Sequence, residues 1–583
     1  MSFICLSPIE ATLIPPSQLT KDDALDGVCI NFDSIPGSKH AALYCLIFGL
    51  AFASSKITLQ NFPDISDKQF IIDYALLAGA HITQPSKGTI VISSGIKRNH
   101  IDPVFLYNCR SSLLVATLHL IVFNSLHVKS HFGGCMIGER PIDQHIKLWR
   151  SLGFTVSSNN SEICIERNSG RNAVVDKVVF DKDTTMGTAA AIYFMAFGYL
   201  KGCEGTNYRP EIKFLLSFVN QFKCKIVWEE ETHLIVHEET SRDYFPNITA
   251  SMPPDPDYIV ALCALAQING RRVSLLNKQG WDIPVIDWME SISSGQIFWN
   301  GDRVEVVPHL QKVQKRDRVE ILATGHPGIP SDMQPIMVAW ALNFAKSVAV
   351  KDARFTGRYK YLKELEALGC KHLGSDNDGY HIVEIYDDNA RPFDAEIVVN
   401  ATDLRACMAM ILAGSIFSKK FVIKHFEQLS RGYPEIVSFM RILGWEISEK
   451  VMNSHTYVAM IIKDESNKFI LQEREDNTNI KNAGNCTFFG GGAESGEAPK
   501  DAIIREMQEE LNLSLSSVTI YGEYTLNSLV YGIDARAIVF IAKGVNLDAL
   551  TLMEGKKFVV CDQDKLPFNI SPFCHVVSDR YND

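Results

Sequence analysis

Hydrophobic and polar positions along residues 60–450 repeat one pattern six times. A helix-like apolar segment ends at or near a glycine, and a short strand, a polar turn and a second strand follow. Segments such as EICIE (162–166) and RVEVV (303–307) alternate apolar and polar residues, which predicts half-buried strands. The six copies are LLAGAHITQPSKGTIVIS from Leu76, LGFTVSSNNSEICIE from Leu152, FKCKIVWEEETHLIVHE from Phe222, SSGQIFWNGDRVEVV from Ser293, LGCKHLGSDNDGYHIVEI from Leu368 and LGWEISEK from Leu443.

The spacing of the copies indicates a true repeat. One residue in each copy marks the end of the predicted helix, and these anchors lie about 70 to 75 residues apart. A glycine there supplies the left-handed turn that ends a helix, so the copy with lysine is the weakest. Two groups of three units predict two similar lobes, with a ligand site between them. The anchors are Gly79, Gly153, Lys223, Gly295, Gly369 and Gly444.

The repeat stops after Lys450, and a different pattern follows. The strands YVAMIIKD (457–464) and KFILQERE (468–475) precede the glycine run FFGGGAESGEAP (488–499) and a long acidic helix. We therefore expect a separate compact domain over residues 455–583, joined by a short linker to the region 1–452.

Composition and charge narrow the classes of function. The chain has 583 residues, a formal net charge of -11 and 46% hydrophobic residues, which is ordinary composition for a soluble globular protein of several domains. This acidity argues against a broad nucleic-acid surface. The start lacks the features of a secretory signal, and the apolar run at 40–53 is shorter than the ~20 residues that span a membrane. The fourteen cysteines contain no CxxC pair. We expect a cytoplasmic protein with no membrane or nucleic-acid partner.

The stretch GGCMIGERP (133–141) places Cys135 beside paired glycines and near Glu139 and Arg140. A lone cysteine is most often a buried, inert small hydrophobe. A glycine-flanked loop with charged neighbours is instead typical of a reactive thiol that meets water or a charged ligand. Both interpretations stay open at this point.

Charged residues in four other stretches bear on that choice. Each alone is typical of a solvated surface residue or a helix cap. Together they supply cations for a phosphate-bearing substrate and carboxylates that can move protons. They are Lys39 in PGSKHAAL, Arg110 in YNCRSSL, Asp332 in HPGIPSDMQ, Asp403 and Arg405 in ATDLRACMAMILAG, and Arg431 in LSRGYPEI.

Several of these stretches carry a family resemblance. FGGCMIGERPIDQHI, HPGIPSDMQ, ATDLRA and SRGY resemble the motifs of the enolpyruvyl transferases over roughly residues 20–450. The cysteine loop is similar to that of the branch that acts on UDP-N-acetylglucosamine, and the shikimate-phosphate branch lacks it. The resemblance implies an α/β fold, a two-lobed inside-out α/β barrel of six units. Lobe one would cover about 36–250, and lobe two about 1–35 plus 251–452.

The resemblance also implies a reaction that needs no cofactor. The sugar 3-hydroxyl of UDP-N-acetylglucosamine attacks C2 of phosphoenolpyruvate while C3 gains a proton, and phosphate then leaves. Lys39, Arg140 and Arg431 would hold the phosphate and carboxylate of phosphoenolpyruvate. Cys135, on a loop that can close, would give the proton to C3 or form a covalent adduct.

Further residues are assigned by the same resemblance. Asp332 would take the proton from the attacking hydroxyl, and Asp403 would stabilise charge around the intermediate. The family's Lys-Asn pair reads Lys39-His40 here, which puts the identity of the acceptor sugar in question. The remaining expected substrate-binding residues are Arg110, Arg140, Pro141, Ile142, Asp143, Gln144, Thr185, Met186, Val350 and Arg405.

The tail carries a second motif. Glu506, Glu509 and Glu510 share one helix face at spacings of three and four, and hard carboxylate oxygens suit Mg²⁺ or Mn²⁺. A bare REMQEE would be an exposed acidic helix, but the upstream GGGAESGE changes that interpretation. The tail resembles the Nudix hydrolases, whose pattern G-x5-E-x7-R-E-U-x-E-E-x-G-U is met from Gly491 onward except that Asn512 replaces the last glycine.

This second resemblance implies an α/β/α sandwich that hydrolyses a nucleoside diphosphate-linked compound with a divalent metal. Glu506, Glu509 and Glu510 would bind the metal and Arg505 would orient them. Glu497 would be a further ligand. The motif also includes Gly491.

The sequence thus predicts a cytoplasmic bifunctional enzyme of peptidoglycan synthesis, a transferase followed by a hydrolase. Its partners would be phosphoenolpyruvate, a UDP-sugar and a nucleoside diphosphate derivative. One alternative keeps the transfer but uses another nucleotide-linked acceptor. A second treats the tail as a module that senses a nucleotide without cleaving it. Neither the Nudix substrate nor the oligomeric state is predicted.

Overall fold

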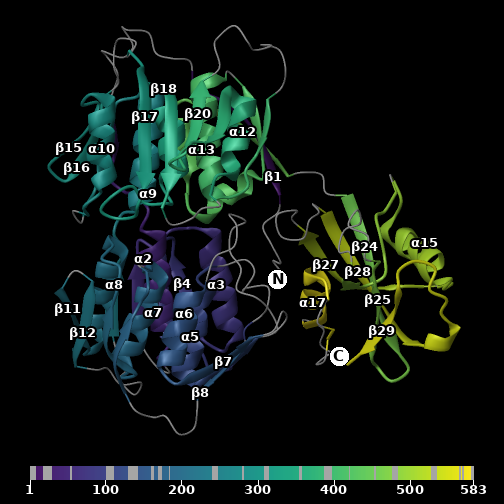
Figure 1. Ribbon diagram of the computed structural model, residues 1–583. Helices are drawn as coiled ribbons and strands as arrows, with labels where there is room; N and C mark the ends of the chain where they lie inside the picture. Colours follow the sequence, from purple (N-terminus) through teal and green to yellow (C-terminus); the bar gives the residue numbers. More distant parts are fainter. Residues whose placement is uncertain are drawn as a thin grey trace.

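In the computed structural model the chain forms two lobes and a smaller third domain (Figure 1). A continuous set of buried apolar residues runs from Ala42 to Met252 and defines the first lobe. A second set combines residues between Ala11 and Ile35 with residues between Tyr258 and Trp445, and defines the second lobe. The structure describes residues 8–579 except for 17–28, 53–55, 100, 102–109, 129–141, 159–162, 168–173, 183, 231, 239–246, 279–280, 308–313, 354–357, 386–396, 419, 452–454, 476–483, 495, 516, 527–534, 563–565 and 568–569.

Three small sheets belong to the first lobe, in the orders β13-β3-β5-β4, β6-β8-β7 and β11-β12-β10-β9. Each contains the antiparallel hairpin of one repeat, and the register pairs Leu59 with Ile90 in the first unit. The strands are β3 (Lys56–Gln60), β4 (His81–Ser86), β5 (Thr89–Ser94), β6 (Ser125–Val128), β7 (Phe154–Ser158), β8 (Ile163–Arg167), β9 (Val175–Val179), β10 (Leu200–Glu204), β11 (Lys225–Glu230), β12 (His233–Glu238) and β13 (Asn247–Ser251).

Three further sheets belong to the second lobe, in the orders β15-β16-β14-β2, β17-β18-β20-β19 and β21-β22-β1-β23. Two strands from the beginning of the chain complete them, so the chain enters the second lobe, crosses to the first and returns. The strands are β1 (Ile9–Ile14), β2 (Ile30–Phe32), β14 (Val273–Leu276), β15 (Ile297–Asn300), β16 (Arg303–Val306), β17 (Arg316–Ala323), β18 (Ala345–Asp352), β19 (Cys370–Ser375), β20 (His381–Ile385), β21 (Val398–Asn400), β22 (Phe421–Lys424) and β23 (Glu446–Val451).

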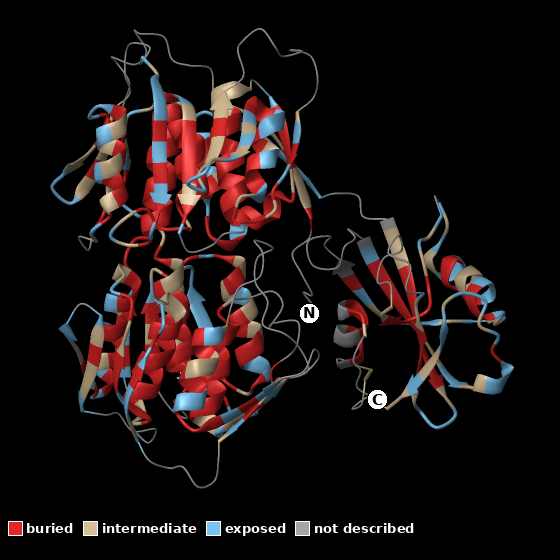
Figure 2. Ribbon diagram, viewed as in Figure 1, coloured by how far each residue is buried: buried red, intermediate tan, exposed pale blue. Residues whose placement is uncertain are grey.

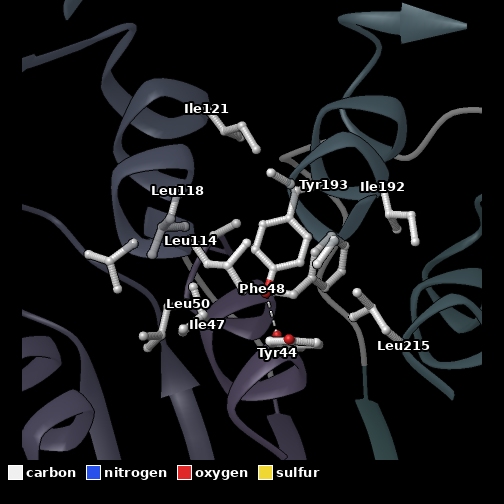
Figure 3. Close-up of a cluster of buried hydrophobic side chains, with 14 of the residues drawn as sticks. Tyr44, Ile47, Phe48, Leu50, Leu114, Leu118, Ile121, Ile192, Tyr193 and Leu215 are labelled. Carbon is white, nitrogen blue, oxygen red and sulfur yellow. Dashed lines mark hydrogen bonds between the residues drawn. The ribbon is translucent and has the colours of Figure 1, made fainter. Parts of the chain in front are cut away.

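Each lobe has three helices that are apolar on all sides and three that are amphipathic. A helix that is apolar all round must be buried, and Figure 2 shows these helices in red inside both lobes. In the first lobe their side chains interlock around Phe48, and the Tyr193 hydroxyl donates to the Tyr44 carbonyl (Figure 3). The buried helices are α2 (Lys39–Gly49), α5 (Ser112–Phe123), α7 (Thr185–Ala196), α9 (Pro256–Ile268), α11 (Gln334–Ala341) and α13 (Leu404–Phe417).

The amphipathic helices end at the six repeat anchors. All six anchors adopt a left-handed backbone, with φ between 58° and 114°. Lys223 does so at φ 58°, after a short 3₁₀ turn, and so performs the role of glycine despite its side chain. The helices are α3 (Ser66–Leu77), α6 (Asp143–Ser151), α8 (Pro210–Val219) with η1 (Asn220–Phe222), α10 (Pro284–Ser293), α12 (Lys360–Leu368) and α14 (Ile436–Ile442), and η2 (Phe426–Arg431) precedes the last.

The expected mixed α/β architecture is confirmed, whereas a barrel in the sense of a closed sheet is not found among the described residues. All six sheets are open. Among the described residues, strands pair within a unit and with one strand from elsewhere in the chain, as β13 does with β3, and no sheet closes on itself.

The third domain is a sheet with one helix on each face. The strand order is β26-β25-β24-β28-β27, and β29 pairs with β25. Alternate residues of β24 face opposite sides: Met460 packs toward α15, and Ile461 toward α17. The elements are β24 (His455–Asp464), β25 (Phe469–Glu473), β26 (Cys486–Thr487), α15 (Pro499–Leu511), β27 (Thr519–Leu526), β28 (Ala535–Val545), η3 (Leu547–Ala549), β29 (Lys557–Cys561) and α17 (Pro572–Asp579). Across the described ranges, no helix is long and apolar enough to cross a bilayer.

Candidate active sites

Lys39 is the first residue of α2 and is held at the boundary between the lobes. Its backbone N–H donates to Asp255 Oδ2 at 2.8 Å, and Asp255 is the N-cap of α9 in the second lobe. Ser38 caps α2. A Cβ on Gly37 would lie 2.0 Å from the Asn61 carbonyl oxygen, so only glycine allows this close approach.

Asp67 joins two of the predicted catalytic cations. Lys39 Nζ lies 2.6 Å from Asp67 Oδ2, and Arg431 Nε donates to Asp67 Oδ1 at 3.1 Å. Lys39 Nζ also donates to the Arg431 carbonyl at 2.7 Å. Burial alone would raise the pKa of the Asp67 carboxyl, but the two cations outweigh it and hold this pKa below its usual value. Two cations from opposite lobes therefore bind the same carboxylate.

Asp332 lies in the turn before α11 and is bound by an arginine that the sequence did not single out. Arg358 donates to Asp332 Oδ1 at 2.7 Å. Burial opposes ionisation, but the charges of Arg358 and Arg405 hold the pKa of Asp332 well below its usual range. The Asp332 carboxylate is thus ionised at neutral pH. It can therefore accept a proton directly from a reacting group.

Asp403 and Arg405 lie at the beginning of α13 with their polar atoms engaged. Asp403 Oδ1 accepts hydrogen bonds from the Arg405 amide at 2.8 Å and the Ala406 amide at 3.1 Å, which makes Asp403 the helix cap. The Arg405 guanidinium pairs with Asp257 and donates to the Tyr433 hydroxyl at 2.6 Å. Both residues therefore order the second lobe around Asp332.

His40 follows Lys39 on α2 and is half-buried. Its Nδ1 lies 3.9 Å from Glu211 Oε1. Burial lowers the pKa of His40, although the charges of Glu211 and Asp332 act in the opposite direction. The ring is thus neutral at neutral pH and offers one donor and one acceptor.

The residues expected at the UDP-sugar meet around the first turns of α6 and α7, which pack together. Burial and then the charge of Arg110 lower the pKa of His145 to about 3, which places Arg110 beside α6. In the first turn of α6, Gln144 Oε1 accepts from the Asp181 amide at 3.0 Å, and Asp143 pairs with Lys182. Ile142 is the N-cap of α6, and Thr185 and Met186 begin α7 behind the Thr184 cap.

Val350 belongs to the second lobe, whereas this group belongs to the first. It lies in the middle of β18, paired with strands on both sides, and its side chain is buried in the second lobe's core. Cys135, Arg140 and Pro141 lie outside the described residues.

The Nudix motif places Arg505 at the centre of three carboxylates. Its guanidinium donates to Glu497 Oε1 at 3.0 Å, to Glu506 Oε1 at 2.9 Å and to Glu509 Oε2 at 2.9 Å. It also donates to the Gly492 carbonyl at 3.1 Å. Arg505 therefore fixes the acidic face of α15 against the glycine-rich loop.

Glu510 points the other way, into the domain. It is only 3% exposed, and it accepts from the Gly490 amide at 2.8 Å and from Gln472 Nε2 at 3.3 Å. Burial, with added repulsion from Glu506 and Glu554, raises the pKa of Glu510 to about 7. The sequence did not single out Glu554, because it lies outside the motif.

Carboxylate oxygens are suitable ligands for a divalent metal, but a side chain that now binds Arg505 would have to move to reach it. Burial raises the pKa of Glu506 as well as that of Glu510, and a cation beside them would relieve this cost. Glu506 and Glu509 both accept from Arg505, so the side chain that binds the metal would have to release or share that contact. In the part of the chain that is described, no three acidic, histidine or cysteine side chains already surround a cation position. Glu506 and Glu510 are thus the residues that would hold the metal.

Sequence reasoning missed several residues at the lobe boundary. Asp67 and Arg358 bind the predicted groups directly, and Asp257 pairs with Arg405. The only sequence signal for Asp67 was its place in the first turn of a helix. Arg209 and Glu211, beside His40, carried no motif.

Comparisons with known proteins match both parts of the chain. Residues 30–440 match the family model described as EPSP synthase (3-phosphoshikimate 1-carboxyvinyltransferase). Residues 453–551 match the NUDIX domain model. The UDP-N-acetylglucosamine 1-carboxyvinyltransferase of Pseudothermotoga lettingae is 27% identical over 423 residues, which cover 69% of this chain and 93% of that protein.

Two solved structures have a similar fold. The enolpyruvyl transferase NikO from Streptomyces tendae superposes with a TM-score of 0.62 at 16% identity and covers 76% of this chain and 99% of its own. The EPSP synthase of Acinetobacter baumannii gives a TM-score of 0.52 at 14% identity, covering 75% of this chain and 100% of its own. At these identities the likeness concerns the fold.

Proposed function

Because the chain belongs to the EPSP synthase family and ends in a Nudix domain, we propose a division of labour between its two parts. The two lobes transfer the enolpyruvyl group of phosphoenolpyruvate to a hydroxyl of a UDP-linked sugar, with UDP-N-acetylglucosamine as the first candidate. The Nudix domain hydrolyses a compound linked to a nucleoside diphosphate.

The observation that carries the transferase proposal is the sharing of Asp67 by Lys39 and Arg431. Phosphoenolpyruvate brings a phosphate and a carboxylate, and both are anions that a neighbouring lysine and arginine can bind. Arginine can bind either anion with two parallel hydrogen bonds, while lysine acts as a point charge. The site lies where α2 meets the second lobe, so both lobes contribute to it.

The proposed chemistry is an addition followed by an elimination. The acceptor hydroxyl gives its proton to Asp332 as its oxygen bonds to C2, and C3 gains a proton. C3 then loses a proton, the C2 to phosphate-oxygen bond breaks, and the double bond re-forms as inorganic phosphate leaves. Asp332 is suited to the first step because Arg358 keeps it ionised and fixed. Cys135 is proposed as the acid for C3.

The proposal of a UDP-sugar acceptor rests on Arg110 and on the first turns of α6 and α7. Arg110 brings a cation to these turns, and the positive end of each helix dipole there favours a diphosphate. The name of the Pseudothermotoga lettingae relative supports UDP-N-acetylglucosamine. His40 in place of asparagine supports a different nucleotide-linked acceptor as the second candidate.

In the Nudix domain we propose that Glu506 and Glu510 hold Mg²⁺ or Mn²⁺ and that Arg505 positions Glu506 and Glu509. When bound, the metal supplies charge neutralisation at the diphosphate and a more acidic water. Gly490 fixes Glu510 through its amide. The glycine-rich loop therefore serves as the support of the carboxylates.

The test is phosphate release from phosphoenolpyruvate with a panel of UDP-sugars and uridine nucleotides. We expect release that depends on one acceptor and is lost in Cys135→Ala. No release with any acceptor would refute the transferase proposal. In parallel, nucleoside monophosphate release from the same panel and from the transferase product tests the Nudix domain, and its absence would favour the nucleotide-sensing alternative.

A further inference from the structure

Arg209 and Glu211 form a polar pair at the beginning of α8 that no step described above uses. Arg209 is the residue before the helix, and Glu211 lies in its first turn. The Arg209 guanidinium lies 3.5 Å from Glu211 Oε1, and His40 Nδ1 lies 3.9 Å from the same oxygen. Helix α8 packs against α2, which carries His40.

The pair has hydrogen-bonding capacity that the described residues do not satisfy. Glu211 is 5% exposed, and its Oε2 accepts no hydrogen bond. Arg209 Nε is also buried and donates none. The ring of His40 makes no hydrogen bond to a described residue. Buried polar groups are normally paired, so the two unpaired buried atoms, Glu211 Oε2 and Arg209 Nε, indicate a partner that is not part of the protein, and half-buried His40 lies beside them.

The pair lies within electrostatic range of the second lobe. The charges of Asp332 and Asp257 both act on Arg209 and on His40, which places the pair beside the proposed proton acceptor. The phosphoenolpyruvate anchor at Asp67 has its own partners and does not involve Arg209. Arg209 and Glu211 are therefore placed to bind the acceptor and not phosphoenolpyruvate.

One hydroxyl group of a ligand can satisfy both the unpaired donor and the unpaired acceptor. Its oxygen can accept a hydrogen bond from Arg209 Nε, and its O–H can donate a hydrogen bond to Glu211 Oε2. We propose that Arg209 and Glu211 recognise a second hydroxyl of the acceptor, on a carbon next to the one that reacts, and so determine which acceptor is used. This inference rests on the proposed function. In UDP-N-acetylglucosamine the group would be the 4-hydroxyl beside the reacting 3-hydroxyl.

The test is a cycle of two changes, one in the protein and one in the acceptor. Phosphate release is measured for wild type and Glu211→Gln with UDP-N-acetylglucosamine and with its 4-deoxy analogue, and the acceptors found active in the panel are treated alike. We expect each single change to raise the KM for the acceptor about 10- to 100-fold, because a hydrogen bond to a charged group is lost. The two changes together should raise the KM for the acceptor little more than either change does alone.

Control measurements separate recognition from folding. Glu204→Gln, on the neighbouring strand β10 and partly exposed, should leave the KM for the acceptor unchanged. Glu211→Gln should leave the KM for phosphoenolpyruvate unchanged, which a merely structural role would not predict. Arg209→Lys changes the proposed hydrogen-bond donor, and this second variant is measured with the same two acceptors. If the protein change and the acceptor change raise the KM independently, so that their fold-effects multiply, the inference is overturned. Absence of phosphate release by wild type with every acceptor would instead refute the proposed function, and the inference with it.

Discussion

Asp67 Oδ1 accepts a hydrogen bond from Arg431 Nε at 3.1 Å, and this contact joins α3 of the first lobe to η2 of the second. Lys39 binds the other oxygen of the same carboxylate. Asp67→Asn removes the carboxylate that both cations bind, so we expect the free energy of unfolding to fall by about 3 kcal/mol. Inorganic phosphate should raise the melting temperature of this variant more than that of wild type, since it supplies the missing charge.

The matched control is Asp317→Asn, which removes an exposed ion pair with Lys346 at 2.8 Å. Exposed ion pairs contribute about 0–1 kcal/mol, so this variant should lose little stability. Inorganic phosphate should raise its melting temperature no more than it raises that of wild type. An equal response of both variants to phosphate would contradict the anion site at Asp67.

Asp255 predicts a pH dependence of stability. Burial, with repulsion from Asp257, raises its pKa to about 7 from the ordinary 3.8. The folded protein then holds a proton between about pH 4 and pH 7 that the unfolded chain has released, so stability falls as the pH rises through this window. Asp255→Asn should flatten that fall by about 3 kcal/mol between pH 5 and pH 8. Denaturant unfolding at pH 5 and pH 8 measures it, and an unchanged pH dependence would contradict the assignment.

Gly491 and Gly492 offer a matched pair in the Nudix loop. A Cβ on Gly491 would lie 2.5 Å from Glu506 Oε1, whereas a Cβ on Gly492 would meet nothing within 4 Å. Gly491→Ala should displace Glu506 and lower the rate of diphosphate hydrolysis at least about 10-fold. Gly492→Ala should keep the rate within about 2-fold. Similar rates for the two variants would remove Glu506 from its proposed role. Phosphate release by the lobes should be unaffected in both.

Asn512 tests the one departure from the Nudix motif. It ends α15 with φ 51° and ψ 33°, the left-handed conformation for which glycine is the usual residue. Asn512→Gly should change the stability of the domain by less than about 1 kcal/mol. Asn512→Val should destabilise it by about 1–2 kcal/mol because a β-branched side chain is strained there. Thermal unfolding compares them, and a harmless valine would contradict the cap assignment.

The repeat and the family could be predicted from the sequence because their signals are local. Each anchor residue follows its own helix, and even Lys223 adopts the conformation that its position in the repeat predicts. The Nudix motif is likewise contained in one loop and one helix. The expected fusion of an enolpyruvyl transferase with a Nudix domain is confirmed.

The partners of the catalytic groups could not be predicted because they come from distant parts of the chain. Asp67 meets Arg431 across 364 positions. A motif finds Asp332 but not the Arg358 that holds it, since the two meet only after folding. Val350 is expected at the substrate, and the burial of its side chain in the second lobe's core depends on packing that its motif does not contain.

The most direct test of the account is a crossed measurement of both activities in Asp332→Asn and Glu506→Gln. Acceptor-dependent phosphate release and diphosphate hydrolysis are followed in each intact variant. The account predicts that Asp332→Asn lowers phosphate release by at least about 100-fold and leaves hydrolysis intact, and that Glu506→Gln does the reverse. Full phosphate release by Asp332→Asn, or loss of both activities in either folded variant, would contradict two independent sites on one chain.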